Sequence, residues 1–294
     1  MTARPPVSVI CPFLGDVSEG HAALASLGRL ALGPGDEVLV ADNTPGGVLA
    51  GAPAPPGVRV LITRVKRGAY DARNEAAAEA TGEWLLFTDA DCVPVGDLVN
   101  RYFDPAPGDR CGALAGEVVA AGTDRAVARY GEARSLLSQA AFLRHPHRPM
   151  AVTANLLVRA AAFDAVGGFA TGIHSGGDAD LCWRLQDAGW ELGYRPRATV
   201  AHAHRETLGA LLRQVVRTSA GTVWLESRHP GSRVPVRPVR SMARAIAGTA
   251  WFAVTLRPRR ATYKVIDGCV IAAQTMGVRR GNGSGLGRGG GPVG

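Results

Sequence analysis

Short apolar runs alternate with stretches of helical spacing through the first 90 residues, and this alternation constrains the fold more than any other feature. The apolar runs end at proline, glycine or polar turn residues, as buried strands do. Strands that alternate with helices predict one doubly wound, mostly parallel sheet flanked by helices. The strands are expected at 7–11, 37–41, 58–62 and 83–88, and the helices at 20–32 and 68–80.

The rest of the chain has weaker patterns. An Arg/Pro-rich stretch at 228–240 has the composition of a linker, and the glycine-rich end at 281–294 is expected to be disordered. Helices are expected at 126–143, 177–188 and 207–218, and two more apolar helices within 241–277.

Charge and cysteine content limit the classes of function. The net charge of +8 favours an anionic partner, such as a diphosphate, a nucleic acid or an acidic lipid surface. Aromatic residues make up only 6% and do not interleave with basic ones, which disfavours a single-strand nucleic-acid binder. The five cysteines are scattered without a CxxC pair, so neither a disulfide framework nor a structural zinc site is expected. No apolar stretch is long enough to span a bilayer, and a cytoplasmic protein is expected.

Two aspartates directly follow the most apolar strand, 83–88. Asp89 and Asp91 are two residues apart at the point where the backbone changes direction, so both carboxylates can face one crevice. Carboxylate oxygens suit Mg²⁺ or Mn²⁺, which bind phosphate oxygens at the same time. A short Asp-x-Asp pattern also occurs as two solvated turn residues. Its position after a buried strand favours the metal site.

Other polar residues lie at the expected strand and helix ends. Asp42 ends the second strand and either contacts a ligand or forms an Asx turn. Arg67 and Arg73 border the helix 68–80, whose N-terminus favours anions. Asp178 opens the helix 177–188, where the helix dipole keeps a carboxylate ionised, as a general base must be, although plain capping is the commoner role.

A histidine pair adds a further candidate ligand. His202 and His204 occur in a period-two segment that predicts both imidazoles on one face of a strand. Either of them could complete a carboxylate metal site. By itself, such a pair is more often found at a surface or in packing.

Taken together, these residues resemble the inverting family 2 glycosyltransferases of the GT-A fold. The third matching stretch, which runs from a helix through a strand into Asp89-Ala90-Asp91, is the most specific. The four matching stretches, in chain order, are 7–12, 38–43, 68–91 and 167–185.

The resemblance implies a fold, a reaction and a set of ligands. It implies a GT-A domain over 1–225, with a nucleotide-sugar half at about 1–115 and an acceptor half at about 116–225. A basic linker and helical extension would follow at 226–280. The implied cofactor is Mn²⁺ or Mg²⁺, and the donor is a nucleoside-diphosphate sugar, with a UDP-sugar preferred over a GDP- or dTDP-sugar. The acceptor would be a small molecule, a peptide or a lipid-linked group, and peripheral contact with the inner face of the membrane is left open.

The resemblance also implies a role for each matching residue. Asp178 would be the general base that deprotonates the acceptor. The donor would be bound by Pro12, Asp42, Arg67, Arg73, Asp89, Gln214 and Arg217, and the metal by Asp91, Asp89 and His202.

The sequence departs from the family pattern at two positions. Gly177 stands where the family usually has a glutamate before the base, and Thr218 stands where processive members have tryptophan.

A nucleotidyltransferase would share the sheet and the carboxylates, but residues 12–16 lack its phosphate loop. A non-catalytic binder of nucleotides or nucleic acid is the other alternative, with weak support from the basic stretch 228–244.

Overall fold

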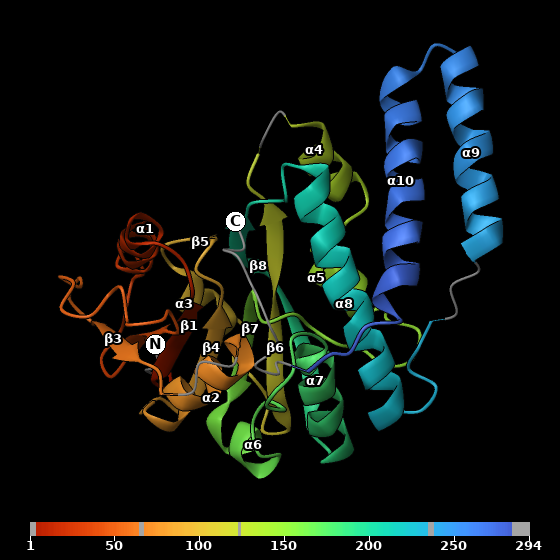
Figure 1. Ribbon diagram of the computed structural model, residues 1–294. Helices are drawn as coiled ribbons and strands as arrows, with labels where there is room; N and C mark the ends of the chain where they lie inside the picture. Colours follow the sequence, from red (N-terminus) through yellow and green to blue (C-terminus); the bar gives the residue numbers. More distant parts are fainter. Residues whose placement is uncertain (1–3, 65–67, 123–124, 235–237, 284–294) are drawn as a thin grey trace. The chain divides into compact units, whose positions relative to one another are not determined.

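The computed structural model describes residues 4–64, 68–122, 125–234 and 238–283 (Figure 1). The chain divides into two compact units. The first comprises 1–121, 137–173 and 177–203, and the second comprises 122–136, 174–176 and 204–294. The second unit thus takes in residues 204–225, which the sequence assigns to the α/β domain.

One mixed sheet organises the described part of the first unit. Its eight strands have the order β3-β2-β1-β4-β7-β6-β8-β5. The strands β3, β2, β1 and β4 are parallel, and β7 runs antiparallel to both β4 and β6. The strands are Val7–Phe13 (β1), Glu37–Asp42 (β2), Val58–Ile62 (β3), Trp84–Thr88 (β4), Cys92–Pro94 (β5), Cys111–Ala120 (β6), Asn155–Arg159 (β7) and Glu191–His202 (β8).

The central strands form the core because they are apolar on both faces. Every residue of β4 is buried, as the expected strand at 83–88 requires. Register places Ile10 beside Phe87 and Phe13 beside Asp42, so the carboxyl ends of β1, β2 and β4 meet at one edge of the sheet. That edge is where ligands bind in sheets of this kind.

Helices cover the sheet of the first unit. The helix α2 packs against β1 and β2, α3 against β8, and α7 also against β8. Asp16 and Glu19 form a reciprocal capping box that starts α1. The helices of this unit are Val17–Leu27 (α1), Ala69–Ala78 (α2), Leu98–Tyr102 (α3), Gln139–Phe142 (α5), Ala160–Ala165 (α6) and Gly177–Asp187 (α7).

The second unit is helical in its described part. Its helices are Ala126–Ala133 (α4), Leu208–Arg228 (α8), Pro238–Val254 (α9) and Pro258–Gly277 (α10). Buried Tyr130, Leu211 and Ile266 join α4, α8 and α10 in a small apolar core. A Cβ on Gly277 would lie 2.5 Å from the carbonyl oxygen of Val216, so glycine permits the close approach of α10 to α8. Among the described residues, no helix is long and apolar enough to cross a membrane.

Three expected helices differ from those observed. The expected helix at 20–32 is displaced, because α1 begins at Val17 and ends at Leu27. The expected helix at 126–143 is wrong: it is interrupted between α4 and α5, where Ser135 adopts a left-handed φ of 52°. The expected helix at 207–218 is too short, because α8 continues to Arg228. The two apolar helices expected within 241–277 are confirmed as α9 and α10. The predicted disordered tail falls largely on 284–294, which lie outside the described residues.

Candidate active site

A cluster of possible metal ligands lies beyond the end of β4. One oxygen, nitrogen or sulfur atom from each of Asp89, Asp91, Cys92 and His202 falls within 4.8 Å of the others. Asp89 and Asp91 occupy the turn between β4 and β5, and Cys92 begins β5. Because β5 pairs antiparallel with β8, with Cys92 opposite His202, a histidine far along the chain is brought to the two aspartates. This strand pairing creates the cluster.

The ring of His202 is oriented as a metal ligand would be. Its Nδ1 lies 2.8 Å from the carbonyl oxygen of Ala203, which can only accept a hydrogen bond, so Nδ1 carries the proton. Its other ring nitrogen, Nε2, faces Asp91 at 3.3 Å from Oδ1, and is the nitrogen available to a metal ion. A backbone acceptor that fixes the ring in this way is typical of metal-binding histidines.

The donor set fits a hard divalent cation. The side chain of Asp91 is 45% exposed and that of Asp89 is 32% exposed, so both can be reached from solvent. Burial raises the pKa of the Cys92 thiol far above its usual range, which disfavours the thiolate that a metal ligand requires. Two carboxylates and one imidazole remain, and these suit Mn²⁺ or Mg²⁺ better than a thiophilic metal.

Arg73 forms an ion pair with an aspartate of this cluster. Its buried guanidinium on α2 donates from Nη2 to Oδ1 of Asp89 at 2.5 Å. It also lies over the rings of Tyr70 and Phe169, at 5.6 Å and 6.0 Å from their centroids. The Nε atom of Arg73 is buried without a hydrogen-bond partner in the described structure. A buried cation held this way stabilises negative charge beside Asp89.

Asp178 lies in the first turn of α7, on the same unit as the metal cluster. Its Oδ1 accepts a hydrogen bond from the Thr153 hydroxyl at 3.0 Å. Burial raises the pKa of the Asp178 carboxyl, and the charge of Asp89 raises it further, whereas the Arg73 guanidinium and Thr153 oppose the rise. A carboxylate with a raised pKa is a stronger proton acceptor, which is what general-base chemistry requires. Two residues further along α7, the buried Asp180 pairs with Arg184 at 2.8 Å, as their spacing predicts.

Tyr70 accounts for the glycine that precedes Asp178. A Cβ on Gly177 would lie 2.8 Å from Cε1 and Cζ of the Tyr70 ring, so the ring fills the space of a side chain at this position. Burial, the Asp178 charge and a hydrogen bond to Asp178 all raise the pKa of the Tyr70 hydroxyl, which therefore stays protonated beside that carboxylate. Tyr70 thus occupies the place of the acidic side chain that Gly177 lacks.

The carboxylate of Asp42 is hydrogen-bonded within its own loop. Its Oδ1 accepts hydrogen bonds from the backbone and the hydroxyl of Thr44, at 2.9 Å and 2.6 Å, and its Oδ2 accepts one from the Leu49 backbone at 2.8 Å. The side chain is fully buried. This is the Asx-turn arrangement that the sequence leaves open. A nucleotide contact from Asp42 stays a prediction.

The other predicted residues lie in several places. Pro12 is in β1 beside Ala41 of β2, at the same end of the sheet as Asp42. Arg67 lies outside the described residues. Gln214 and Arg217 are three residues apart on α8, which belongs to the second unit, and their part in donor binding stays a prediction.

One expectation about the histidines is wrong. The strand β8 ends at His202, so His204 does not share its strand face. His204 belongs to the second unit, where its ring lies against Gly131 of α4: a Cβ on that glycine would be 2.8 Å from Nδ1.

Tyr70 and Thr153 are site residues that the sequence does not single out. Tyr70 is one residue into α2 and reads as an ordinary apolar position of the helix. The only signal for it is the missing glutamate at position 177, which implies that another group fills that space. Thr153 lies in a loop without a pattern, so the sequence carries no signal for its contact with Asp178.

A mixed α/β sheet with an aspartate and histidine cluster at its strand ends defines the GT-A class of fold. Comparisons with known proteins agree with this fold. The family model "Glycosyl transferase family 2" matches residues 8–167, and "Glycosyl transferase family group 2" matches residues 98–267. The chain belongs to glycosyl transferase family 2.

Two curated relatives are glycosyltransferases by name. The "Pre-mycofactocin glycosyltransferase" of Mycobacterium tuberculosis is 32% identical over 188 residues, which is 61% of this chain and 39% of the relative. "Glycosyltransferase AglE" of Haloferax volcanii is 27% identical over 210 residues, 70% of this chain and 64% of the relative. The chain therefore spans less than two thirds of the length of either relative.

One solved structure confirms the fold. It is described as "Mannosyltransferase PcManGT from Pyrobaculum calidifontis in complex with GDP-Man and Mn2+". Its TM-score is 0.67 at 18% sequence identity, and the superposition covers 93% of this chain and 87% of that one.

Proposed function

We propose that the chain is a metal-dependent, inverting glycosyltransferase that moves a sugar from a nucleoside diphosphate to an acceptor hydroxyl. The observation that carries the proposal is the cluster of Asp89, Asp91 and His202, with Arg73 joining it to Asp178. Membership of family 2 favours this reaction over a nucleotidyltransferase or a non-catalytic binder.

The metal-binding role falls to Asp91, Asp89 and His202. A divalent cation bound there would neutralise the negative charge that develops on the departing diphosphate. Mn²⁺ accompanies GDP-Man in the similar structure from Pyrobaculum calidifontis, which supports a divalent ion in this site. Arg73 holds Asp89 in place by their ion pair and adds a buried positive charge on the same side.

Asp178 is assigned the role of general base. It takes the proton of the acceptor hydroxyl while that oxygen attacks the anomeric carbon from the face opposite the diphosphate. One bond to the sugar forms as the other breaks, and the configuration inverts. The buried thiols of Cys11, Cys92 and Cys182 have pKa values well above the usual range, so they are protonated and unsuited to a covalent sugar intermediate.

The donor is assigned to the nucleoside-diphosphate sugars as a class. The sequence resemblance favours a UDP-sugar, whereas the similar mannosyltransferase from Pyrobaculum calidifontis is in complex with GDP-Man. A thermal-shift panel of UDP, GDP, dTDP and short DNA, each with and without Mn²⁺, identifies the ligand. We expect one nucleotide to raise the melting temperature, and only when the metal is present.

Asp91→Asn tests the proposal directly. We expect this variant to keep its fold and its far-UV circular dichroism, but to lose the metal-dependent nucleotide shift and donor hydrolysis. Arg110→Gln is the control, because Arg110 is exposed and forms an ion pair with Glu191 on the surface. Turnover that is unchanged in Asp91→Asn would refute the assignment, and stabilisation by DNA alone would favour the non-catalytic binder.

A further inference from the structure

The helical hairpin of α9, α10 and the turn between them, residues 238–280, exposes apolar side chains at its tip. Trp251 is 65% exposed, Val254 81% and Leu256 87%. Leu256 also has a left-handed φ of 54°, which is unfavourable for a residue with a branched side chain. Apolar side chains gathered at one solvent-facing point mark an interaction site rather than ordinary surface.

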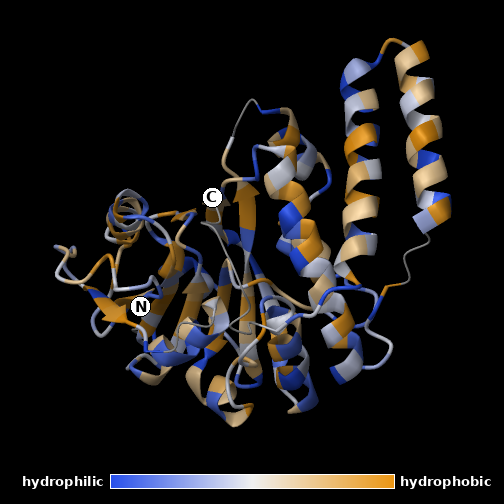
Figure 2. Ribbon diagram, in the orientation of Figure 1, coloured by the Kyte–Doolittle hydropathy of each residue, from blue (hydrophilic) through white to orange (hydrophobic). Residues whose placement is uncertain are grey.

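A separate apolar area lies at the other end of the hairpin, near the start of α9 and the end of α10. Val239 and Ile246 are 83% and 65% exposed and share one side of the helix at a spacing of seven. Together with Met276 of α10 they line an apolar groove of about 600 Å³ between the two helices. Figure 2 shows these hydrophobic stretches on both helices of the hairpin.

The hairpin is also strongly basic. Asp267 is its single acidic residue, and it is neutralised within the unit by Arg134 and Lys264, at 2.7 Å and 3.0 Å. The arginines and lysine of the hairpin are Arg240, Arg244, Arg257, Arg259, Arg260, Lys264, Arg279 and Arg280. Three of these positive charges, at 257, 259 and 260, immediately follow the exposed apolar tip.

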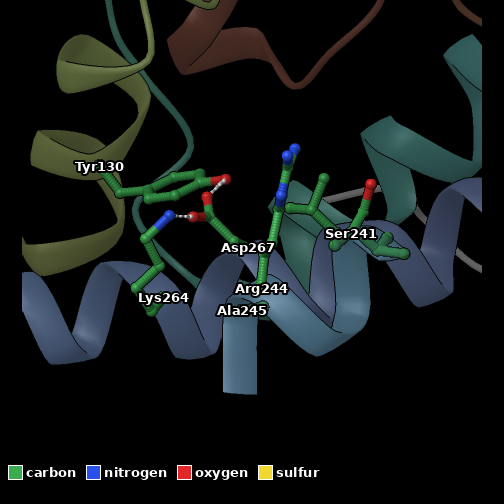
Figure 3. Close-up of a pocket in the computed structure, with 8 residues that line it drawn as sticks. Tyr130, Ser241, Arg244, Ala245, Lys264 and Asp267 are labelled. Atoms are coloured by element: carbon green, nitrogen blue, oxygen red, sulfur yellow. Dashed lines mark hydrogen bonds and ion pairs between the residues drawn. The ribbon is translucent and has the colours of Figure 1, made fainter. Parts of the chain in front are cut away.

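A second pocket lies beside this basic surface. It has a volume of about 280 Å³ and is bordered by Arg244, Lys264 and Ser241 (Figure 3). Lys264 is held by Asp267, whereas the exposed Arg244 makes no hydrogen bond or ion pair with the described residues. A cation and a hydroxyl at the rim of a small pocket are suited to an oxyanion such as a lipid phosphate.

We propose that the hairpin 238–280 is a docking surface for an anionic lipid bilayer, with Trp251, Val254 and Leu256 entering the headgroup region. Apolar side chains flanked by arginines are the features that hold a helix at the interface of an acidic membrane. Tryptophan prefers this depth because its ring is amphipathic. A second copy of the chain is a poorer occupant, because two hairpins of this charge would repel each other.

Vesicle flotation of the full chain tests the proposal. The probes are phosphatidylcholine vesicles with and without about 30 mol% phosphatidylglycerol. We expect binding only to the anionic vesicles, with most of it lost at about 0.5 M salt. Neither donor nor acceptor is present, so the result is independent of the proposed sugar transfer.

Two sets of variants distinguish specific membrane binding by the tip from non-specific hydrophobic or electrostatic attraction. Trp251→Ala/Val254→Ala/Leu256→Ala should lower the bound fraction about tenfold. Its control, Leu14→Ala/Val17→Ala/Val223→Ala, removes three other exposed apolar side chains and should bind normally. Arg257→Gln/Arg259→Gln/Arg260→Gln should weaken binding, whereas Arg29→Gln/Arg110→Gln/Arg197→Gln removes the same charge elsewhere and should have little effect. Circular dichroism confirms that each variant is folded.

Three outcomes would overturn the proposal. The first is a full chain that does not bind anionic vesicles. The second is an equal loss of binding in the test and control variants, which would mean attraction by net charge alone. The third is a concentration-dependent dimer that the tip variant disrupts, without vesicle binding, which would make the hairpin an interface between copies.

Discussion

The ring of Tyr70 fills the space that a side chain at Gly177 would need, since a Cβ there would come within 2.8 Å of two ring carbons. The same ring carries a hydroxyl that is hydrogen-bonded to Asp178. One tyrosine on α2 thus explains both the absence of a glutamate before the candidate base and the polar partner that the base has instead.

Gly177→Ala should be destabilising because the added methyl group overpacks the site. We expect a loss of about 1–3 kcal/mol in the free energy of unfolding. In the double variant Tyr70→Ala/Gly177→Ala this penalty should largely disappear, because the ring is no longer in the way. Urea unfolding of the wild type, both single variants and the double variant measures the coupling. Additive losses would show that the two residues do not compete for space.

Tyr70→Phe keeps the ring and removes only the hydroxyl. We expect unchanged stability and donor binding, but a kcat reduced by about tenfold, because Asp178 loses a hydrogen bond that orients it. Steady-state kinetics with varied donor separates kcat from KM. A change in KM alone, with kcat preserved, would place Tyr70 in donor binding instead. Tyr263→Phe is a control, since Tyr263 lies in the second unit.

Asp178→Asn should abolish transfer but not folding. We expect kcat to fall by at least about 100-fold while the metal-dependent nucleotide shift is retained, because the variant loses only the proton acceptor. Equal loss of donor binding and transfer would instead indicate a structural cap.

The raised pKa of Asp178 has consequences for pH. As a base it must be ionised, so kcat/KM should fall with acidification at a pH above the usual aspartate pKa of 3.8. In the folded state this carboxyl holds its proton more tightly than in the unfolded state. Its stabilising contribution is therefore complete at low pH and is lost as pH rises through the folded-state pKa. At neutral pH the ionised group opposes folding, so Asp178→Asn should melt at a higher temperature than the wild type.

His202→Gln should weaken metal binding selectively. The imidazole Nε2 that faces Asp91 is lost, and we expect the Mn²⁺ concentration for half-maximal activity to rise by about 10–100-fold. The activity at saturating metal should largely recover. His204→Gln is the matched control, because His204 lies against Gly131 in the second unit. An equal effect of both variants would argue against His202 as the ligand.

The sequence by itself determined the strands that build the sheet and the position of the two aspartates after the most buried of them. These features are local: an apolar run bounded by turn residues predicts a strand. Asp89 and Asp91 could therefore be predicted as a pair at the end of β4.

Only the tertiary structure decided which distant residues join that pair. Pairing of β5 with β8 brings His202 to Asp91, and β8 ends before His204. The fold also places Tyr70 of α2 against Gly177 of α7. Equally, both helices of the hairpin are apolar in sequence, yet only the fold shows which side chains remain exposed. The reason is that strand register and helix packing depend on contacts between residues far apart in the chain, which no local pattern encodes.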